Sequence, residues 1–315
     1  MQHDTPIIFS GNSNPALTQK ICQYLGLPLG KIEMKKFSDG ELWVKYKENI
    51  RGRDIFIVQS THPPSQNIME LLIMIDAAKR ASAKRVTAVL PYFGYARQDR
   101  KDQPRVALTA KLIANLITTA GADRVIAMDL HAAQLQGFFD IPFDHLYASP
   151  VFIPLIKERS RNLVVVSADI GGIKLARSYA NKIDSEFAVI DKRRPKHNIA
   201  EAMNIIGEVN DKDVLIVDDL IDTGGTFVAA ITALKNKGAK DVYGIITHPL
   251  FSGDAVEKIE ESELKSLYVT DSIPFTKAKL STKIKVQSAS VLFAEAIIRS
   301  FRNESISSLF DIDKS

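Results

Sequence analysis

The stretch that decides the fold is VLIVDDLIDTGGT, residues 214–226. It opens with four apolar residues and continues into two adjacent carboxylates, Asp218 and Asp219. It then closes on Asp-Thr-Gly-Gly-Thr, just before an apolar pattern of helical period. A short β-branched run predicts a buried strand, and the glycines and threonines that follow predict a turn into a helix. Ligands of open parallel sheets bind beyond the carboxyl ends of the strands, so this turn is expected to carry binding chemistry.

Outward from this stretch, short apolar runs alternate with longer amphipathic runs along most of the chain. Continuous apolar strands separated by helices indicate parallel sheets covered on both faces, so the fold class is α/β. The pattern predicts strands at residues 54–58, 85–90, 124–128, 163–166, 187–190, 214–217 and 242–247. It predicts helices at residues 67–80, 108–120, 173–180 and 226–237.

The length of 315 residues suggests two domains, at about 150 residues each. Residues 120–125 (AGADRV) echo residues 237–242 (KGAKDV), each joining a helix to a strand. Two similar halves would explain the echo, and so would the common use of glycine after helices. The periodicity breaks at residues 147–150, where turn-forming residues gather. We predict domains at residues 1–147 and 148–315, with the last helix packing on the first domain.

The amino-acid composition limits the classes of protein to which the chain can belong. Hydrophobic residues make up 45% and charged residues 25%, which is typical of a folded globular chain. The net charge of +4 is spread along the sequence, which suits an anionic small molecule and disfavours a nucleic-acid binder. No apolar run reaches about 18 residues, and the start lacks a secretory pattern. The single Cys22 suits a reducing compartment, so we expect a cytoplasmic protein without membrane or nucleic-acid partners.

The turn at residues 222–226 has the chemistry of a phosphate cradle. Glycines let a ligand approach the backbone closely, and the N–H groups of a helix start bind phosphate. Thr223 and Thr226 add hydroxyl groups, while Asp218 and Asp219 can accept hydrogen bonds from sugar hydroxyls or hold a metal. The combination fits a ribose 5-phosphate site, and the alternative is a plain capped turn. The segment lacks the Gly-x-x-x-x-Gly-Lys pattern of a Walker loop.

Three other segments carry candidate chemistry. Residues 91–101 (PYFGYARQDRK) offer a cationic rim for a polyphosphate, with Tyr92, Phe93 and Tyr95 as a stacking surface for a nucleobase; the alternative is a solvated charge run. Asp129 and His131 end a predicted strand, and Asp169 occupies the equivalent place after residues 163–166. These positions suit a magnesium–nucleotide complex, although His131 could instead be a packing residue.

Residues 191–198 (DKRRPKHN) follow another predicted strand. So many like charges cannot pack together without an anion, so the segment is expected to be mobile without a ligand; the alternative is a plain exposed loop.

The segments FSDGE (residues 37–41), PYFGYARQDRK and DLHAAQLQGFFD (residues 129–140), together with the phosphate cradle, resemble the class I ribose-phosphate diphosphokinases, also called phosphoribosyl pyrophosphate synthetases. The resemblance extends from residues 10–12 to residues 307–310. It implies two similar domains of the type I phosphoribosyltransferase kind, each a mainly parallel sheet flanked by helices. It also implies transfer of the diphosphoryl group of MgATP to the 1-hydroxyl of ribose 5-phosphate, releasing AMP.

The same resemblance implies roles for individual residues. Lys192 and Arg194 would be catalytic, and His131 and Asp169 would bind Mg²⁺. ATP would be bound by Phe37, Asp39, Gly40, Glu41, Arg97, Gln98, Asp99 and Lys101. Ribose 5-phosphate would be bound by Arg194, Asp218, Asp219, Asp222, Thr223, Gly224, Gly225 and Thr226.

The resemblance further implies a homo-oligomer, expected to be a hexamer, whose active sites are shared between subunits. Regulation by phosphate and ADP is expected at a region that includes Arg51, Ser82, Gln134 and residues 307–310. Two departures from the family pattern are Ala168 in a usual Ser-Pro-Asp and Gly224 in a usual Thr-Ala-Gly; neither removes a functional group, and Gly224 is expected to loosen the loop slightly. The alternatives are a salvage phosphoribosyltransferase and a non-catalytic regulatory paralogue.

Overall fold

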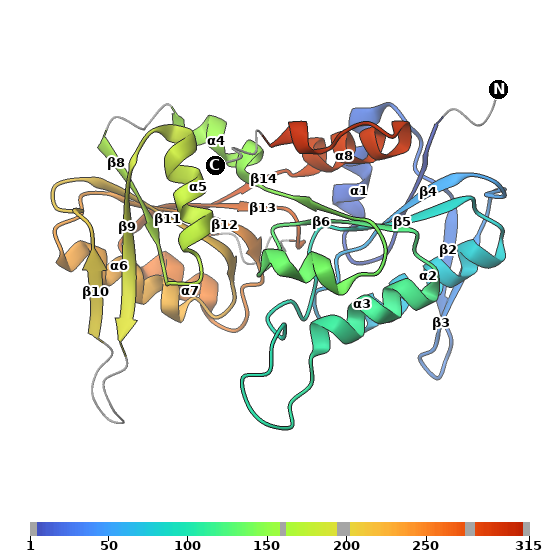
Figure 1. The fold of residues 1–315 in the computed structure, drawn as a ribbon, viewed down its shortest axis with the longest axis horizontal. Helices are drawn as coiled ribbons and strands as arrows, with labels where there is room; N and C mark the ends of the chain where they lie inside the picture. Colours follow the sequence, from blue (N-terminus) through green and yellow to red (C-terminus); the bar gives the residue numbers. More distant parts are fainter. Residues whose placement is uncertain (1–4, 158–161, 194–201, 275–280, 311–315) are drawn as a thin grey trace. The chain divides into compact units, whose positions relative to one another are not determined.

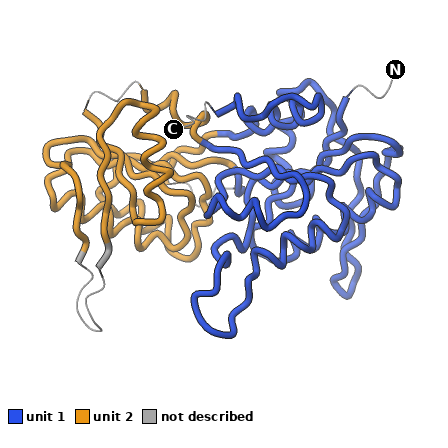
Figure 2. Tube along the Cα trace, in the orientation of Figure 1, with its two compact units in different colours: residues 1–148, 272–274, 288–315 blue, residues 149–271, 275–287 orange. Residues whose placement is uncertain are grey.

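The chain is seen in a computed structural model that describes residues 5–157, 162–193, 202–274 and 281–310 (Figure 1). It forms two compact units (Figure 2). Unit 1 comprises Met1–Ala148, Ser272–Pro274 and Ser288–Ser315, and unit 2 comprises Ser149–Asp271 and Phe275–Gln287. No helix among the described residues is long and apolar enough to cross a membrane.

Unit 1 is built on a five-stranded parallel sheet in the order β1-β4-β5-β6-β7. Helices α2 and α3 cover one face, and α1 and α8 lie on the other (Figure 1). The strands are β1 (Ile7–Ser10), β4 (Asp54–Val58), β5 (Arg85–Leu90), β6 (Arg124–Met128) and β7 (Phe143–Leu146). The helices are α1 (Pro15–Leu25), α2 (Gln66–Arg80), α3 (Thr109–Ala120) and α8 (Ser290–Arg302), with short 3₁₀ turns η1 (Ala133–Phe138) and η4 (Ser307–Leu309).

Unit 2 is built on a seven-stranded sheet in the order β10-β9-β8-β11-β12-β13-β14, parallel except for β10 against β9. The strands are β8 (Leu163–Ser167), β9 (Glu186–Arg193), β10 (Ala202–Ile206), β11 (Asp213–Ile221), β12 (Val242–Pro249), β13 (Leu264–Thr270) and β14 (Ile284–Gln287). The helices are α4 (Ser149–Lys157), α5 (Ile173–Ile183), α6 (Gly225–Asn236) and α7 (Ala255–Glu261). The α/β prediction is confirmed, because every crossover strand that the periodicity marked is present.

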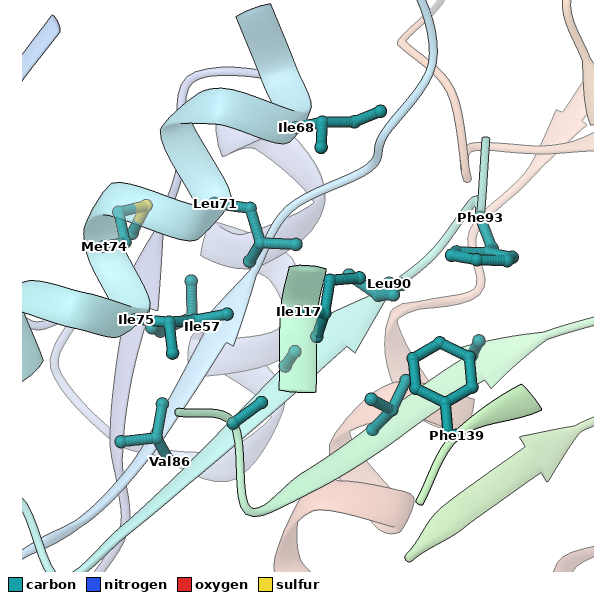
Figure 3. Packing of buried hydrophobic residues seen from close by; sticks show 14 of the residues in the cluster. Ile57, Ile68, Leu71, Met74, Ile75, Val86, Leu90, Phe93, Ile117 and Phe139 are labelled. Atoms are coloured by element: carbon teal, nitrogen blue, oxygen red, sulfur yellow. The ribbon is translucent and has the colours of Figure 1, made fainter. Parts of the chain in front are cut away.

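The core of unit 1 explains why its strands are mostly apolar. Ile57 and Val86 on the sheet are fully buried against Leu71 and Ile75 of α2 (Figure 3). Each such side chain contributes about 1.5–3 kcal/mol by leaving water. Because both faces of the sheet are covered in this way, no strand alternates between polar and apolar residues.

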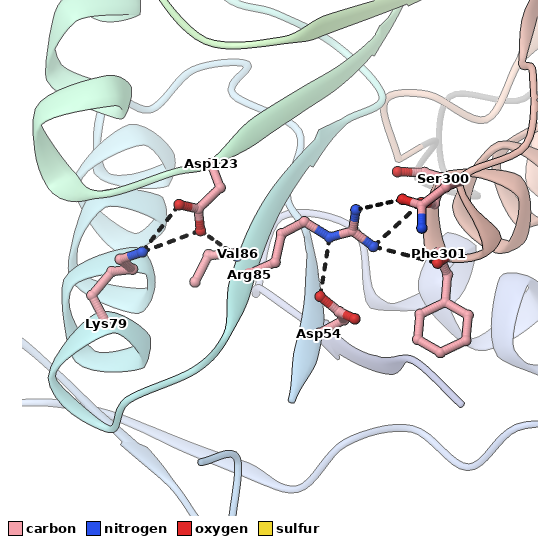
Figure 4. A network of polar contacts seen from close by, with 8 residues as sticks. Asp54, Lys79, Arg85, Val86, Asp123, Ser300 and Phe301 are labelled. Atoms are coloured by element: carbon pink, nitrogen blue, oxygen red, sulfur yellow. Dashed lines mark hydrogen bonds and ion pairs between the residues drawn. The ribbon is translucent and has the colours of Figure 1, made fainter. Parts of the chain in front are cut away.

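Helix α8 is fixed within unit 1 at its carboxyl end. The Nε of Arg85 on β5 donates to Asp54 at 3.0 Å, and its Nη2 donates to the carbonyl oxygens of Ser300 at 3.3 Å and Phe301 at 3.5 Å (Figure 4). A guanidinium at the last carbonyls of a helix satisfies groups that have no partner within the helix. Arg85 therefore joins the sheet to the end of the last helix.

Cys22 lies in α1 and is buried. Burial raises the pKa of its thiol to about 11, so the thiol stays protonated near neutral pH. The residue therefore packs as a small apolar side chain.

Candidate functional site

In unit 2, two strand ends bring carboxylates together. Strands β8 and β11 are parallel neighbours in which Ser167 faces Val217, so Asp169 after β8 lies beside Asp218 of β11. The hydroxyl of Ser167 donates to the backbone oxygen of Asp169 at 2.6 Å. The Oδ1 of Asp169 accepts the N–H of Gly172 at 2.9 Å, at the start of α5. Asp169 is therefore held in place by its own turn.

The strand that carries the paired acids is longer than predicted. β11 continues to Ile221 and pairs with β12 through Asp218 opposite Ile246 and Leu220 opposite His248. Asp218 and Asp219 thus lie within the strand, whereas the sequence placed them after it. The extra sheet pairing fixes their backbone more firmly than a loop would.

The electrostatics of this end of the sheet favour a ligand that offsets negative charge. The pKa of Asp218 is raised well above its ordinary value, first by burial and then by the charges of Asp219 and Asp169. A carbon at the Cβ position of Gly172 would lie 3.7 Å from an oxygen of both Asp169 and Asp218. Hydroxyl donors of a sugar, or a divalent cation, would stabilise the ionised carboxylates here.

The phosphate cradle follows directly after these acids. Helix α6 begins at Gly225, with no acidic residue in its first turn and no side-chain hydrogen bond at its N-cap, Gly224. Thr223, Gly225 and Thr226 are exposed, and the backbone oxygen of Asp222 accepts the N–H of Ser252 at 2.9 Å. A helix start with this composition can bind an anion through its backbone N–H groups.

Gly224 adopts a φ of 74°, in the left-handed region. The sequence suggested that glycine loosens the loop at this position. The backbone shows instead that glycine is the residue that adopts this conformation without strain.

We expect Gly224→Ala to lower the free energy of unfolding by about 1–2 kcal/mol, because an L-residue with a side chain is strained at this φ. The space itself is adequate, since the nearest atom to an added Cβ, the backbone oxygen of Ala255, lies at 3.4 Å. Gly225→Ala is the matched control, because nothing lies within 4 Å of its Cβ position. Chemical denaturation without ligand measures both variants. Equal stability of the two would contradict the role of the positive φ.

In unit 1, the segment 37–41 is the turn of a hairpin. Strands β2 (Ile32–Lys36) and β3 (Leu42–Tyr46) are antiparallel and form a separate two-stranded sheet. The N–H of Phe37 donates to the oxygen of Glu41 at 2.8 Å, and Gly40 closes the turn with a φ of 101°. Phe37 is 52% exposed, and Asp39 and Glu41 are exposed. The hairpin therefore presents an aromatic ring and two acids together to a ligand or a partner.

The predicted stacking surface near residue 92 is largely wrong. Tyr92 and Phe93 are buried at 6% and 2% exposure because they complete the core at the end of β5. Tyr95 alone of the three aromatic residues is exposed. The cationic rim that follows it is at the surface: Arg97, Gln98, Arg100 and Lys101 are exposed, and Asp99 is half-buried.

The proposed metal ligands belong to different units. His131 is exposed, just beyond the carboxyl end of β6 in unit 1, and Asp169 lies in unit 2. Within the described residues, no group of three or more histidine, cysteine, aspartate or glutamate side chains is arranged to hold a metal ion by itself. Mg²⁺ often uses one or two protein ligands together with substrate phosphates, and the carboxylate of Asp169 has the oxygen chemistry that such an ion prefers.

The two predicted catalytic residues lie at the edge of the described chain. Lys192 is in β9, where its backbone pairs with Met203, and its side chain is not described. Arg194 lies outside the described residues.

Sequence reasoning missed the hairpin and His145, which contacts the turn before His131. The hairpin had a signal: residues 32–36 (IEMKK) and 42–46 (LWVKY) flank a short polar segment that contains glycine. The role of His145 had none, since it depends on a contact between β7 and the turn that follows β6.

Two family profiles match the chain. One is described as the N-terminal domain of ribose phosphate pyrophosphokinase and covers residues 6–121; the other is the phosphoribosyl synthetase-associated domain and covers residues 192–311. The chain is 58% identical to a ribose-phosphate pyrophosphokinase of Chlorobaculum tepidum, over 98% of this chain and 96% of that protein. It is 54% identical to the protein of the same name from Rhizobium meliloti, over 96% and 99% of the two chains. A crystal structure of phosphoribosylpyrophosphate synthetase from Mycobacterium smegmatis superposes with a TM-score of 0.90 at 38% identity, covering 95% of this chain and 99% of that one.

Proposed function

The chain belongs to the ribose-phosphate pyrophosphokinase family, enzymes of nucleotide biosynthesis, and on that premise we propose that it transfers the β,γ-diphosphoryl group of MgATP to the 1-hydroxyl of ribose 5-phosphate. The products would be AMP and 5-phosphoribosyl 1-diphosphate. The observation that carries this proposal is the placement of paired aspartates directly before a phosphate cradle in unit 2. That order matches a sugar phosphate, which has hydroxyls at one end and a phosphate at the other.

In this proposal the ribose 5-phosphate site is formed by β11 and the start of α6. The phosphate would accept hydrogen bonds from the backbone N–H groups of Gly224, Gly225 and Thr226 and from the hydroxyl of Thr223. Asp218 and Asp219 would accept from the ribose hydroxyls. The raised pKa of Asp218 supports this assignment. It shows that the ionised forms of Asp218 and Asp219 lack stabilisation, which hydrogen-bond donors or a cation would supply. Asp222 and Arg194 complete the proposed set.

The nucleotide would be bound by unit 1 motifs. Phe37 and its neighbours Asp39, Gly40 and Glu41 sit on the exposed hairpin turn, which suits contact with a base and its amino group. Arg97 and Lys101, with Gln98, would contact the phosphates, and Asp99 would complete the ATP-binding set. His131 and Asp169 would hold Mg²⁺, which supplies neutralisation of phosphate charge when it is bound.

The reaction needs positioning and charge neutralisation rather than a covalent nucleophile. The protein's part would be to orient the 1-hydroxyl in line with the β-phosphorus, with Lys192 and Arg194 stabilising the charge that develops during transfer.

We expect Asp222→Ala to weaken the binding of ribose 5-phosphate by about tenfold or more, because a hydrogen bond to a charged group contributes about 1.5–3 kcal/mol. ATP binding should persist, since Asp222 belongs to the sugar-phosphate loop of unit 2, whereas the motifs assigned to ATP belong to unit 1. Titration calorimetry with each ligand measures both effects. Glu257→Ala, an exposed acid of α7 in the same unit, is the control. Loss of ATP binding with unchanged ribose 5-phosphate binding would contradict this division of the site.

An AMP-release assay tests the function itself. The proposal expects AMP to form in proportion to ribose 5-phosphate when ATP and Mg²⁺ are present. A salvage phosphoribosyltransferase would form no AMP from ATP and ribose 5-phosphate and would instead consume the diphosphate product together with a nucleobase. A regulatory paralogue would release none and would still associate with active subunits.

The remaining expectations are part of the same proposal. We propose a cytoplasmic homo-oligomer, a hexamer, with phosphate and ADP as regulators. Arg51, Ser82 and Gln134 are exposed on unit 1, as are Ser307 and Ser308 of η4, which leaves these positions open to a ligand or a neighbouring subunit.

A further inference from the structure

The turn that presents His131 has a strained backbone. Asp129, directly after β6, has a φ of 35° and is only 5% exposed. An L-residue with a side chain is uncommon in this region, and such a conformation costs about 1–3 kcal/mol. It persists only where the surrounding structure fixes it, so the contacts of Asp129 and Leu130 decide where His131 lies.

Hydrogen bonds from neighbouring segments hold this turn. The N–H of Asp129 donates to the carbonyl of Leu146 at 2.9 Å, and the Oδ2 of Asp129 accepts the N–H of Ala148 at 3.3 Å. A side chain from outside the turn also contributes: the N–H of Leu130 donates to Nε2 of His145 at 3.0 Å. Leu130 is 7% exposed, so losing that acceptor would leave a buried N–H with one partner fewer.

The imidazole of His145 is itself held in place. His145 lies on β7 opposite Ala127 of β6. Its ring packs against Tyr147 with centroids 4.5 Å apart, and Tyr147 meets the buried ring of Phe310 at 5.7 Å, edge to face. Because an N–H can donate only to a nitrogen that carries a lone pair, Nε2 is unprotonated and a neutral ring carries its proton on Nδ1.

We propose that His145 is a positioning residue for magnesium–ATP binding: its Nε2 fixes the main chain of Leu130, and this fixes the side chain of His131 that follows. The inference rests on the proposed function, in which His131 is a Mg²⁺ ligand. His145 acts through the backbone and contacts neither metal nor nucleotide. Partners that orient a metal ligand in this way typically change metal affinity by about 10- to 100-fold when they are removed.

The test compares replacements that keep or remove the acceptor. His145→Phe keeps the aromatic packing against Tyr147 and removes the acceptor; His145→Leu also removes it, with a different shape. His145→Gln keeps an amide oxygen near the position of Nε2. Mn²⁺ binding in the presence of ATP, followed by electron paramagnetic resonance, gives the metal affinity. Amide hydrogen exchange at Leu130 reports the hydrogen bond directly.

We expect the Phe and Leu variants to bind Mn²⁺–ATP about tenfold or more weakly, with faster exchange at Leu130, and the Gln variant to stay within about threefold of the native chain. Ribose 5-phosphate binding should be unchanged in all three. The melting temperature of each variant shows whether it folds. If the Phe or the Leu variant does not fold, the other of these two decides the outcome. Native Mn²⁺–ATP affinity in a folded Phe or Leu variant would overturn the inference, and so would equal weakening in the Gln variant.

His131→Ala separates this inference from the function on which it rests. If His131→Ala leaves Mn²⁺–ATP affinity unchanged, the proposed ligand role of His131 fails. If His131→Ala weakens binding while the folded Phe and Leu variants do not, only the positioning role of His145 fails.

Discussion

Lys192→Ala and Arg194→Ala should each lower turnover about a hundredfold or more while leaving the fold intact. Each variant would remove a cation that stabilises the charge developing on the transferred group, a contribution of about 3 kcal/mol. AMP release at saturating ATP and ribose 5-phosphate measures turnover. The melting temperature should barely change, because lysine and arginine side chains rarely form part of a protein's buried core.

The control for this prediction is Lys237→Ala, which removes an exposed lysine just after α6. Lys237→Ala changes the net charge by the same amount as Lys192→Ala or Arg194→Ala and should keep native turnover. Normal turnover in Lys192→Ala or Arg194→Ala would refute the catalytic role of that residue. A large loss of melting temperature would instead assign the residue a structural role.

Glu41→Ala and Lys192→Ala should each be nearly inactive alone and should regain activity when the two chains are co-expressed. Glu41 is exposed on the hairpin turn of unit 1, and Lys192 is the second-last residue of β9 in unit 2. If each active site is formed by the hairpin of one chain and the Lys192 segment of another, some sites in the mixed oligomers combine an intact Glu41 with an intact Lys192. With equal expression and random assembly in a closed symmetric oligomer, about a quarter of the sites should be intact.

Two measurements make the complementation test decisive. Differently tagged chains, purified in sequence through both tags, show that the oligomers contain both variants. Co-expression of either variant with the double variant Glu41→Ala/Lys192→Ala should give no recovery, because every site then lacks one contribution. Mixed oligomers that work no better than their parents would exclude sharing of the nucleotide site in this arrangement.

The crossover elements could be predicted because their signals are local. Strands β4, β5 and β6 begin and end at the predicted residues, since a continuous apolar run bounded by charged or turn residues defines a buried strand by itself. Strand β11 was predicted four residues too short at its carboxyl end. Its acids resemble a loop in the sequence, and only pairing with β12 shows that the strand continues.

The candidate site was predictable wherever a motif carried its own chemistry. The sequence placed Asp218, Asp219 and the glycines in one strand–turn–helix unit, because these residues are neighbours in the chain. It failed at Tyr92 and Phe93, whose burial depends on what packs over the end of β5, such as the ring of Phe139, 5.7 Å from that of Phe93. Exposure of an aromatic residue is a property of its neighbours in space, and periodicity does not report it.

The sequence by itself determined the α/β class, the helices and strands of the crossovers, and the residue types of the phosphate cradle, because each depends on residues within one turn or one strand. Only the tertiary structure decided that Asp169 lies beside Asp218, that residues 37–41 cap a hairpin, and that His145 holds the turn before His131. These contacts join residues that lie 10 to 50 positions apart or on neighbouring strands. They form when the sheet assembles, and their geometry follows from strand order and register, which no local pattern specifies.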